Sequence, residues 1–290
     1  MKENKTGIPG LYRMTVGEKE ILFPDSSLSG IELSGFTTDF LEKTIYQRME
    51  ETQSGSMEEY LSVIVKDAGE ENRLKDLLYV GYSEFFRNSL TFAVLERLIF
   101  PSLFIHHQQT NRKELRIWSL ACAGGQEAYS LAILLEELIK EKKVPWNYRI
   151  FATDKSSEQV EWARKGVFSQ QSLAKVPFSA MVQWFDKQEG SYVVKPELKR
   201  RIDFSVFDLL DQMNSSPPAS IFGDFVIVFC SNVLFYYKPE FRTAILEKAT
   251  GCLSKDGNIV VGDMERSYLL NAHFHEVYPH SGIFRNKERE

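Results

Sequence analysis

The sequence has no excess of positive charge and no long uninterrupted apolar run, and each absence disfavours a class of protein. A net charge of −5 over 290 residues disfavours nucleic acids and anionic membranes as partners, because both attract basic surfaces. The first 30 residues lack the apolar core of a signal peptide, and we find no run of about 18 apolar residues. We therefore expect a cytoplasmic protein with no direct membrane insertion.

Cysteines and histidines are also few. The three cysteines, Cys122, Cys230 and Cys252, are odd in number and far apart, which fits neither a disulfide framework nor a zinc site. We interpret them as small core residues. The five histidines show no HExxH spacing, and we expect no metal.

What the sequence does contain is RIWSLACAGGQEAYS, residues 116–130. An apolar run meets small residues at 123–125, and a helical pattern begins at Gln126, so the stretch predicts a strand, a tight turn and a helix. Glycines allow backbone N–H groups to approach a ligand, and a helix N-terminus carries partial positive charge. The pattern fits a ligand cradle, although an ordinary strand-to-helix turn has the same outline.

From Arg116 onward, apolar strand patterns alternate with helical ones. This alternation predicts an α/β domain with a mostly parallel sheet covered by helices on both faces. The expected strands are residues 116–123, 148–154, 201–208, 224–232 and 258–263, and the expected helices are residues 126–142, 157–166 and 239–254.

Polar residues stand where these strands end. Asp154 ends the second strand about 30 residues after the glycine turn, Asp208 ends the third, and Asn232 ends the fourth. Ligands bind at the carboxyl ends of parallel strands, and a carboxylate in the position of Asp154 suits the two hydroxyls of a ribose. Each residue alone also fits a helix cap or turn. Together they favour a nucleoside-type ligand, as in nicotinamide dehydrogenases and S-adenosylmethionine methyltransferases.

The first part of the chain has a different character. We expect an irregular segment at 1–35, then a small all-α N-terminal domain with a linker helix at 36–104, and the α/β domain at 105–290. Within the helical domain, Ser56 and Glu59 have capping-box spacing. Arg87 follows two phenylalanines just before the α/β region and is suited to holding an anionic group, although a solvated surface arginine fits equally well.

Six motifs in order resemble those of CheR-type chemotaxis receptor methyltransferases. YSEFFR is similar to the family's TxFFR, RIWSLACAGGQEAYSLA to RIWSAACSTGEEPYSIA, and FATD to ATD. WARKGVFS, VFDLL and FCSNVLFYYKPE are similar to A-x-x-G-x-Y, HNLL and CRNVLIYF. The resemblance implies a Rossmann-like class I methyltransferase sheet, and it leaves room for a β-subdomain within 168–200. It also implies esterification of glutamate side chains with S-adenosylmethionine, which becomes S-adenosylhomocysteine.

The resemblance also implies the site residues. Arg87 and Tyr236 are similar to the pair nearest the transferred methyl group. The implied cofactor contacts are Ser83, Arg87, Gly125, Gln126, Glu127, Asp154, Asp208, Leu209, Asn232 and Val233.

Four positions depart from the family pattern: Gly81, Gln126, Asp208 and Ser231. Gln126 replaces the first glutamate of GEE, so the hold on the methionine ammonium should be weaker. The chemistry needs no general base, since a glutamate carboxylate is already a nucleophile at neutral pH. The protein must align the reacting groups and exclude water.

The resemblance implies an acidic helical protein substrate, such as a chemoreceptor cytoplasmic domain, and we expect the enzyme to be a monomer. Two alternatives stay open. A non-catalytic cofactor-binding regulatory module of the same fold is compatible with the four departures. A nicotinamide dehydrogenase is disfavoured because AGGQEA lacks the G-x-G-x-x-G spacing.

Overall fold

The computed structural model describes residues 11–16, 19–24, 35–78, 81–109, 114–143, 146–220, 223–270 and 274–286. The chain divides into two compact units. The first contains the residues up to Gly81 together with Phe235–Phe241, and the second contains Tyr82–Leu234 and Arg242–Glu290. The linker helix that we expected to end the helical domain at residue 104 therefore packs with the α/β unit.

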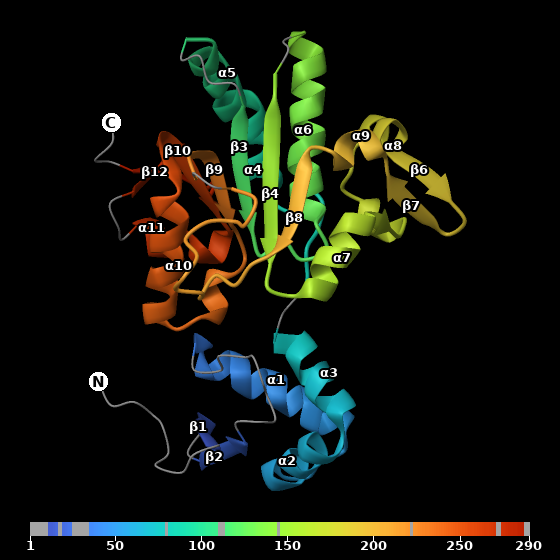
Figure 1. Ribbon diagram of the computed structural model, residues 1–290, viewed down its shortest axis with the longest axis vertical. Coiled ribbons are helices and arrows are strands. Elements are labelled where there is room, and N and C mark those ends of the chain that lie inside the picture. Colours follow the sequence, from blue (N-terminus) through green and yellow to red (C-terminus); the bar gives the residue numbers. More distant parts are fainter. Residues whose placement is uncertain are drawn as a thin grey trace. The chain divides into compact units, whose positions relative to one another are not determined.

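The first unit is built on three helices, α1 (Thr38–Glu51), α2 (Met57–Lys66) and α3 (Ala68–Leu78) (Figure 1). At the start of α2 the Ser56 hydroxyl accepts a hydrogen bond from the Glu59 N–H at 3.2 Å, which confirms the predicted cap. The expected irregular segment also contains an antiparallel hairpin of β1 (Leu11–Val16) and β2 (Lys19–Pro24). The buried hydrophobic residues of this unit are Phe36, Leu41, Ile45, Tyr60, Ile64, Leu74 and Leu78.

A buried ion pair joins α1 to α3. The Arg48 guanidinium donates to Glu70 at 2.8 Å and 2.5 Å, and the Tyr60 hydroxyl donates to the same carboxylate at 3.0 Å. Burial acts to raise the pKa of Glu70, but these hydrogen bonds hold it below its usual value. Moving α1 away from α3 would leave the Arg48 and Glu70 charges buried without a partner, which is costly. The ion pair therefore fixes how these two helices pack.

Residues 235–241 complete this first unit from far along the chain. Phe36 and Tyr237 form an isolated antiparallel bridge, and the Thr37 N–H donates to the Tyr236 carbonyl at 2.8 Å. The Tyr236 ring lies 4.7 Å from that of Phe40, centroid to centroid. The helical core is therefore made from two distant stretches of sequence.

The second unit contains a seven-stranded sheet in the order β11-β12-β10-β9-β3-β4-β8 (Figure 1). Strands β10, β9, β3, β4 and β8 pair in parallel, whereas β12 is antiparallel to both of its neighbours. The predicted mostly parallel α/β fold is confirmed. The bounds are β3 Leu115–Leu120, β4 Tyr148–Asp154, β8 Ile202–Val206, β9 Phe225–Cys230, β10 Leu253–Val261, β11 Phe274–Glu276 and β12 Ile283–Asn286.

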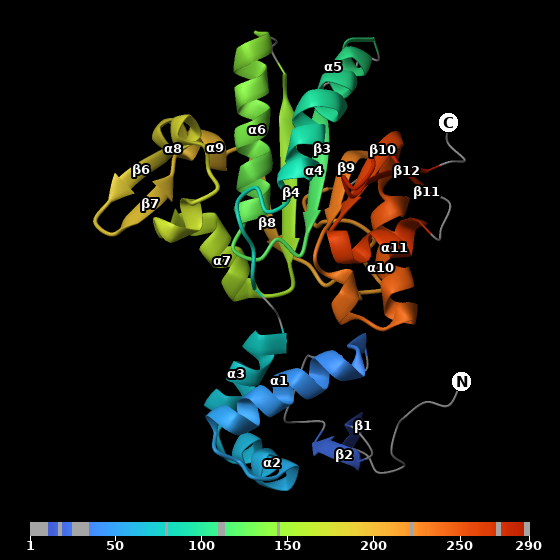
Figure 2. The ribbon, with the colours of Figure 1, turned by 180° about the vertical axis from the view of Figure 1, so that it is seen from behind.

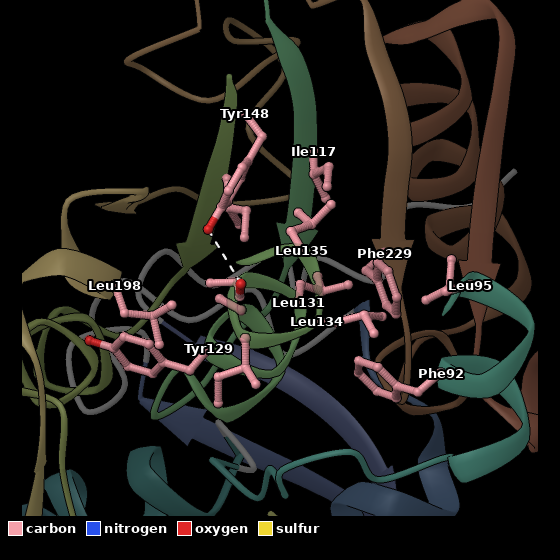
Figure 3. Packing of buried hydrophobic residues seen from close by; sticks show 14 of the residues in the cluster. Phe92, Leu95, Ile117, Tyr129, Leu131, Leu134, Leu135, Tyr148, Leu198 and Phe229 are labelled. Carbon is pink, nitrogen blue, oxygen red and sulfur yellow. Dashed lines mark hydrogen bonds between the residues drawn. The ribbon is translucent and has the colours of Figure 1, made fainter. Parts of the chain in front are cut away.

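Hydrophobic residues pack on both faces of this sheet. On one face, Phe92 and Leu95 point toward Phe229 of β9 (Figure 3), and helices α5 and α6 lie over this side (Figure 2). On the other face, Trp118 packs against Phe225 with ring centroids 5.5 Å apart.

The helices are α4 Ser89–Val94, α5 Phe100–Gln109, α6 Gln126–Lys142, α7 Ser157–Lys165, α10 Pro239–Gly251 and α11 Arg266–Leu270, with short 3-10 turns η4 Leu234–Tyr236 and η5 Asp263–Glu265.

A π-helical turn, η2 (Leu95–Ile99), joins α4 to α5. It lies just before Pro101, which cannot donate the backbone hydrogen bond of a regular helix. Among the described residues, the stretch Ser89–His106 is long and apolar enough to cross a membrane, and 44% of it is buried. Its contact with Phe229 is that of a core helix.

A small three-stranded antiparallel sheet lies in the range where a β-subdomain was expected. Its order is β5-β7-β6, and Figure 1 shows it beside α7. Phe168 of β5 belongs to the same hydrophobic cluster as the main sheet. The elements are β5 Val167–Phe168, η3 Gln171–Leu173, α8 Phe178–Trp184, β6 Phe185–Gln188, β7 Ser191–Val194 and α9 Pro196–Lys199.

Candidate functional site

The carboxyl ends of the parallel strands meet at one edge of the sheet. Strands β3, β4, β8 and β9 run in the same direction, so the glycine turn, Asp154, Asp208 and Asn232 all follow strands at this edge (Figure 1). Such an edge is where α/β proteins bind ligands.

The turn after β3 has an unusual backbone. Ala121 and Ala123 have positive φ angles of 49° and 47°, and Gly125 has a φ of 85°. A side chain at Gly125 would place its Cβ 2.9 Å from the Ala163 Cβ, so only glycine fits. Left-handed alanines cost roughly 1–3 kcal/mol each and persist only where the surroundings enforce them. Such strain is concentrated at functional sites.

Asp154 enforces part of this geometry. Its Oδ2 accepts a hydrogen bond from the Ala123 N–H and its Oδ1 one from the Ser156 N–H, both at 2.9 Å. Burial raises the pKa of Asp154, and these backbone donors oppose the shift. Each carboxylate oxygen has a further lone pair, so the group can still accept hydrogen bonds from a ligand.

The first turn of α6 contains the next two predicted residues. The Gln126 amide folds over Gly124, and its Oε1 is buried without a hydrogen-bond partner. Glu127 Oε1 accepts a hydrogen bond from the Ser119 hydroxyl at 2.6 Å. Burial, and then the negative charge of Glu265, raise the pKa of Glu127 to about 7. The site therefore contains an orphaned acceptor and a carboxyl that titrates near neutral pH.

The segment 82–87 is anchored by its two phenylalanines. Phe85 is fully buried, with its ring centroid 4.9 Å from that of Phe168. Phe86 has a φ of 49°, and its N–H donates to the Ser130 hydroxyl at 3.0 Å. Arg87 is then exposed.

Electrostatics connect this segment to α6. The charge of Arg87 lowers the pKa of Glu127, against the larger effect of burial. The Arg87 guanidinium also lies 5.2 Å from the centroid of the Tyr82 ring. Ser83 is half-buried in the same segment.

Asp208 and Leu209 follow β8. One oxygen of Asp208 accepts a hydrogen bond from the Leu210 N–H at 2.9 Å, and the other lies 2.9 Å from the Lys155 ammonium. Leu209 is buried. Since Lys155 follows Asp154 directly, this ion pair links the ends of β4 and β8.

Asn232 and Val233 follow β9, and both are held by a residue that the sequence analysis missed. The Asn232 N–H donates to Glu265 Oε2 and the Val233 N–H to Glu265 Oε1, each at 2.7 Å. Glu265 ends η5, just after β10. The Glu265 carboxylate also accepts a hydrogen bond from the Gly262 N–H at 2.8 Å. Because Gly262 has no side chain to cap a helix, the sequence shows no capping-box pattern here.

Tyr236 lies in the first packing unit, with Phe40 as a ring neighbour. The other predicted residues belong to the second unit. Among the described residues no group of three or more His, Cys, Asp or Glu side chains is arranged to hold a metal.

Comparison with known proteins gives one family match. The family described as "CheR methyltransferase, SAM binding domain" matches residues 82–281. A chemotaxis protein methyltransferase of Borreliella burgdorferi is 27% identical over 239 residues, covering 81% of this chain and 83% of that protein. Chemotaxis protein methyltransferase 1 of Pseudomonas aeruginosa is 29% identical, covering 88% of this chain and 91% of that protein. Chemotaxis protein methyltransferase Cher2 of Pseudomonas putida is 30% identical, covering 74% of this chain and 76% of that protein.

Proposed function

The chain belongs to the CheR methyltransferase family, and we propose that it transfers a methyl group from S-adenosylmethionine to glutamate side chains of a chemoreceptor-type protein, forming methyl esters. The observation that carries the proposal is the match of the S-adenosylmethionine-binding family to residues 82–281. The carboxyl ends of the parallel strands β3, β4, β8 and β9 of this chain lie within this range. The relatives give no support to a non-catalytic regulatory module, since they are named methyltransferases.

The residues at the strand ends suit this cofactor. Its methionine part has a positively charged ammonium, its sulfonium is positive, and its ribose offers two hydroxyls. The buried Gln126 Oε1 without a partner and the Glu127 carboxyl provide acceptors for a cationic group. Asp154 has lone pairs left for hydroxyls.

The proposed cofactor contacts follow from this placement. Asp154 binds the ribose, and Gln126 with Glu127 holds the ammonium near the turn at Gly125. The ion pair with Lys155 holds the side chain of Asp208 in one orientation. We therefore propose that Asp208 contributes a hydrogen-bond acceptor of fixed position to the adenine subsite. The remaining proposed contacts are Ser83, Arg87, Leu209, Asn232 and Val233.

When bound, S-adenosylmethionine supplies an activated methyl group together with its own leaving group. The chain then has to orient a carboxylate and remove water from it. Arg87 suits the first task because it is exposed at the edge of the site, and its planar guanidinium can pair with both oxygens of a carboxylate. We assign Tyr236 to the methyl region through its hydroxyl, on the family resemblance alone.

The proposed substrate is an acidic helical protein such as a chemoreceptor cytoplasmic domain, and we propose that the enzyme is a cytoplasmic monomer. The chain's own charge bears on how such a substrate is recognised. Between residues 35 and 78, acidic residues outnumber basic ones by ten to five. The stretch 35–78 is therefore acidic overall, and long-range attraction to an acidic helix has to come from basic residues elsewhere.

The proposal is tested by mixing the protein with radiolabelled S-adenosylmethionine and a glutamate-bearing helical receptor fragment. A matched fragment has every candidate glutamate changed to alanine. We expect label in the first fragment alone, released as methanol at high pH because esters hydrolyse there. Base-stable label, or equal label in both fragments, would contradict the glutamate ester.

A further inference from the structure

Glu265 is a buried carboxylate that binds backbone rather than side chains. Its Oε1 accepts hydrogen bonds from the Val233 and Leu234 N–H groups at 2.7 Å and 2.6 Å. Its Oε2 accepts from the Asn232 and Gly262 N–H groups at 2.7 Å and 2.8 Å. Its side chain is fully excluded from solvent. Four backbone donors thus converge on one anion.

Three of these donors are consecutive, from Asn232 to Leu234. Successive N–H groups that point to one side form a nest, a concavity that binds anions. Asn232 has a φ of 62°, the left-handed conformation that lets its N–H align with the next two. Such nests often receive a ligand's anionic group, but here the chain's own Glu265 fills it.

The filled nest determines where the loop after β9 lies. Asn232 and Val233 are two of the proposed cofactor contacts, and their conformation is unfavourable unless the aligned N–H groups find an acceptor. Because Glu265 comes from the turn after β10, its carboxylate ties this loop to a neighbouring strand. The loop then needs no cofactor to adopt its shape.

We propose that Glu265 is a positioning residue that holds the Asn232–Leu234 loop in its cofactor-binding conformation by filling the backbone nest with an internal carboxylate. The proposal rests on the function proposed above, because it assigns Glu265 a part in building that cofactor site. It gives the chain a preorganised loop before the cofactor arrives.

The charge of Glu265 acts on the site as well. It raises the pKa of Glu127, which burial has already raised, while the Ser119 hydroxyl and Arg87 oppose both effects. The pKa of Glu265 itself is raised by burial and held down by its four backbone donors. Removing the charge of Glu265 should therefore let Glu127 ionise at lower pH.

The first test compares Glu265→Gln with Glu276→Gln. Glu276 is a matched control, since it also accepts two backbone N–H bonds, from His280 and Gly282, and it pairs with Arg266. In Glu265→Gln an amide NH₂ faces two backbone donors, so at least two hydrogen bonds are lost. We expect S-adenosylhomocysteine affinity, measured by calorimetry, to fall at least roughly tenfold. Glu276→Gln should retain wild-type affinity even where its melting temperature falls equally.

The second test is chemical rescue. Glu265→Ala leaves the nest empty, and formate is a carboxylate small enough to enter it. We expect formate to restore part of the S-adenosylhomocysteine affinity, whereas neutral formamide should not. Where the alanine variant folds but is too unstable for calorimetry, its melting temperature with and without formate replaces affinity as the measurement.

The third readout is the pH dependence of S-adenosylhomocysteine binding. The midpoint of this pH profile reports the ionisation of Glu127. In Glu265→Gln the midpoint should move to lower pH, which a purely structural defect does not produce. Unchanged affinity in folded Glu265→Gln, equal affinity loss in Glu276→Gln, or absence of formate rescue would each overturn the proposal. A wild-type protein that binds no S-adenosylhomocysteine would instead refute the proposed function.

Discussion

The Asp154 carboxylate accepts a hydrogen bond from the backbone N–H of Ala123 at 2.9 Å. The end of β4 thereby holds the turn that follows β3, and the proposed ribose-binding residue also maintains the proposed cofactor cradle. Loss of this carboxylate should therefore affect binding and stability together.

Asp154→Ala removes the acceptor of the Ala123 and Ser156 N–H groups. Each unpaired donor costs about 1–3 kcal/mol, so we expect a lower melting temperature, by roughly 2–4 °C for each kcal/mol in a domain of this size. S-adenosylhomocysteine binding should become undetectable by calorimetry. Asp203→Ala, which removes a surface partner of Arg149, is the control and should change neither quantity measurably. Retained binding in Asp154→Ala would reject the ribose assignment.

Gln126→Glu restores a carboxylate beside the turn. A charge-assisted hydrogen bond exceeds a neutral one by about 1–2 kcal/mol, so cofactor affinity should rise by roughly tenfold in a calorimetric titration. Gln183→Glu on α8 adds the same charge away from the strand ends and should leave affinity unchanged. Equal or weaker binding in Gln126→Glu would mean that Glu127 alone holds the ammonium.

The pKa of Glu127, raised to about 7, gives two pH dependences of opposite sign. The folded state keeps a proton that the unfolded state releases at the ordinary pKa of 4.5, so this contribution to stability is full below about pH 4.5 and lost as pH rises through 7. Cofactor affinity should instead rise with pH, because the ionised carboxylate attracts the ammonium. Melting curves and calorimetry from pH 5 to 8 measure both effects. In Glu127→Gln both should disappear, and a wild-type affinity independent of pH would contradict the role of Glu127.

Arg87→Lys tests the proposed orientation of the substrate carboxylate. Lysine keeps the charge but cannot form the paired hydrogen bonds of a guanidinium, and misplacement by about 1 Å can cost on the order of a hundredfold in rate. We expect at least a tenfold lower rate of base-labile methyl incorporation, with an unchanged melting temperature. Arg97→Lys, at an exposed helical position beside Glu96, should retain the full rate. Full activity in Arg87→Lys would contradict the proposal that Arg87 orients the substrate carboxylate, and Arg87 would then be an ordinary surface residue.

Local patterns in the sequence predicted much of the second unit. The helix Gln126–Lys142 and the strand Tyr148–Asp154 were predicted with their observed bounds, because each has a clear period and a sharp end. β11 and β12 were not predicted, since both are only three or four residues long.

The sequence was less informative about the parts of the candidate site that are built from backbone groups. Asp154 and Asn232 could be selected because polar side chains at strand ends are visible in the sequence. The partners of Glu265 are backbone N–H groups, which every non-proline residue has, so residue types gave no sign that four of them converge. The packing of Tyr236 against Phe40 is likewise invisible, since it joins residues almost two hundred positions apart.

The bridge between Phe36 and Tyr237 has a consequence for folding during synthesis. The ribosome releases residues up to Gly81 long before it makes Phe235–Phe241, yet both stretches belong to one packing unit. At roughly 5–20 residues per second, the helical unit waits on the order of ten seconds for its last segment. During that interval Phe36 and Phe40 lack their tyrosine neighbours, so the N-terminal unit reaches its final packing only after most of the chain has been translated.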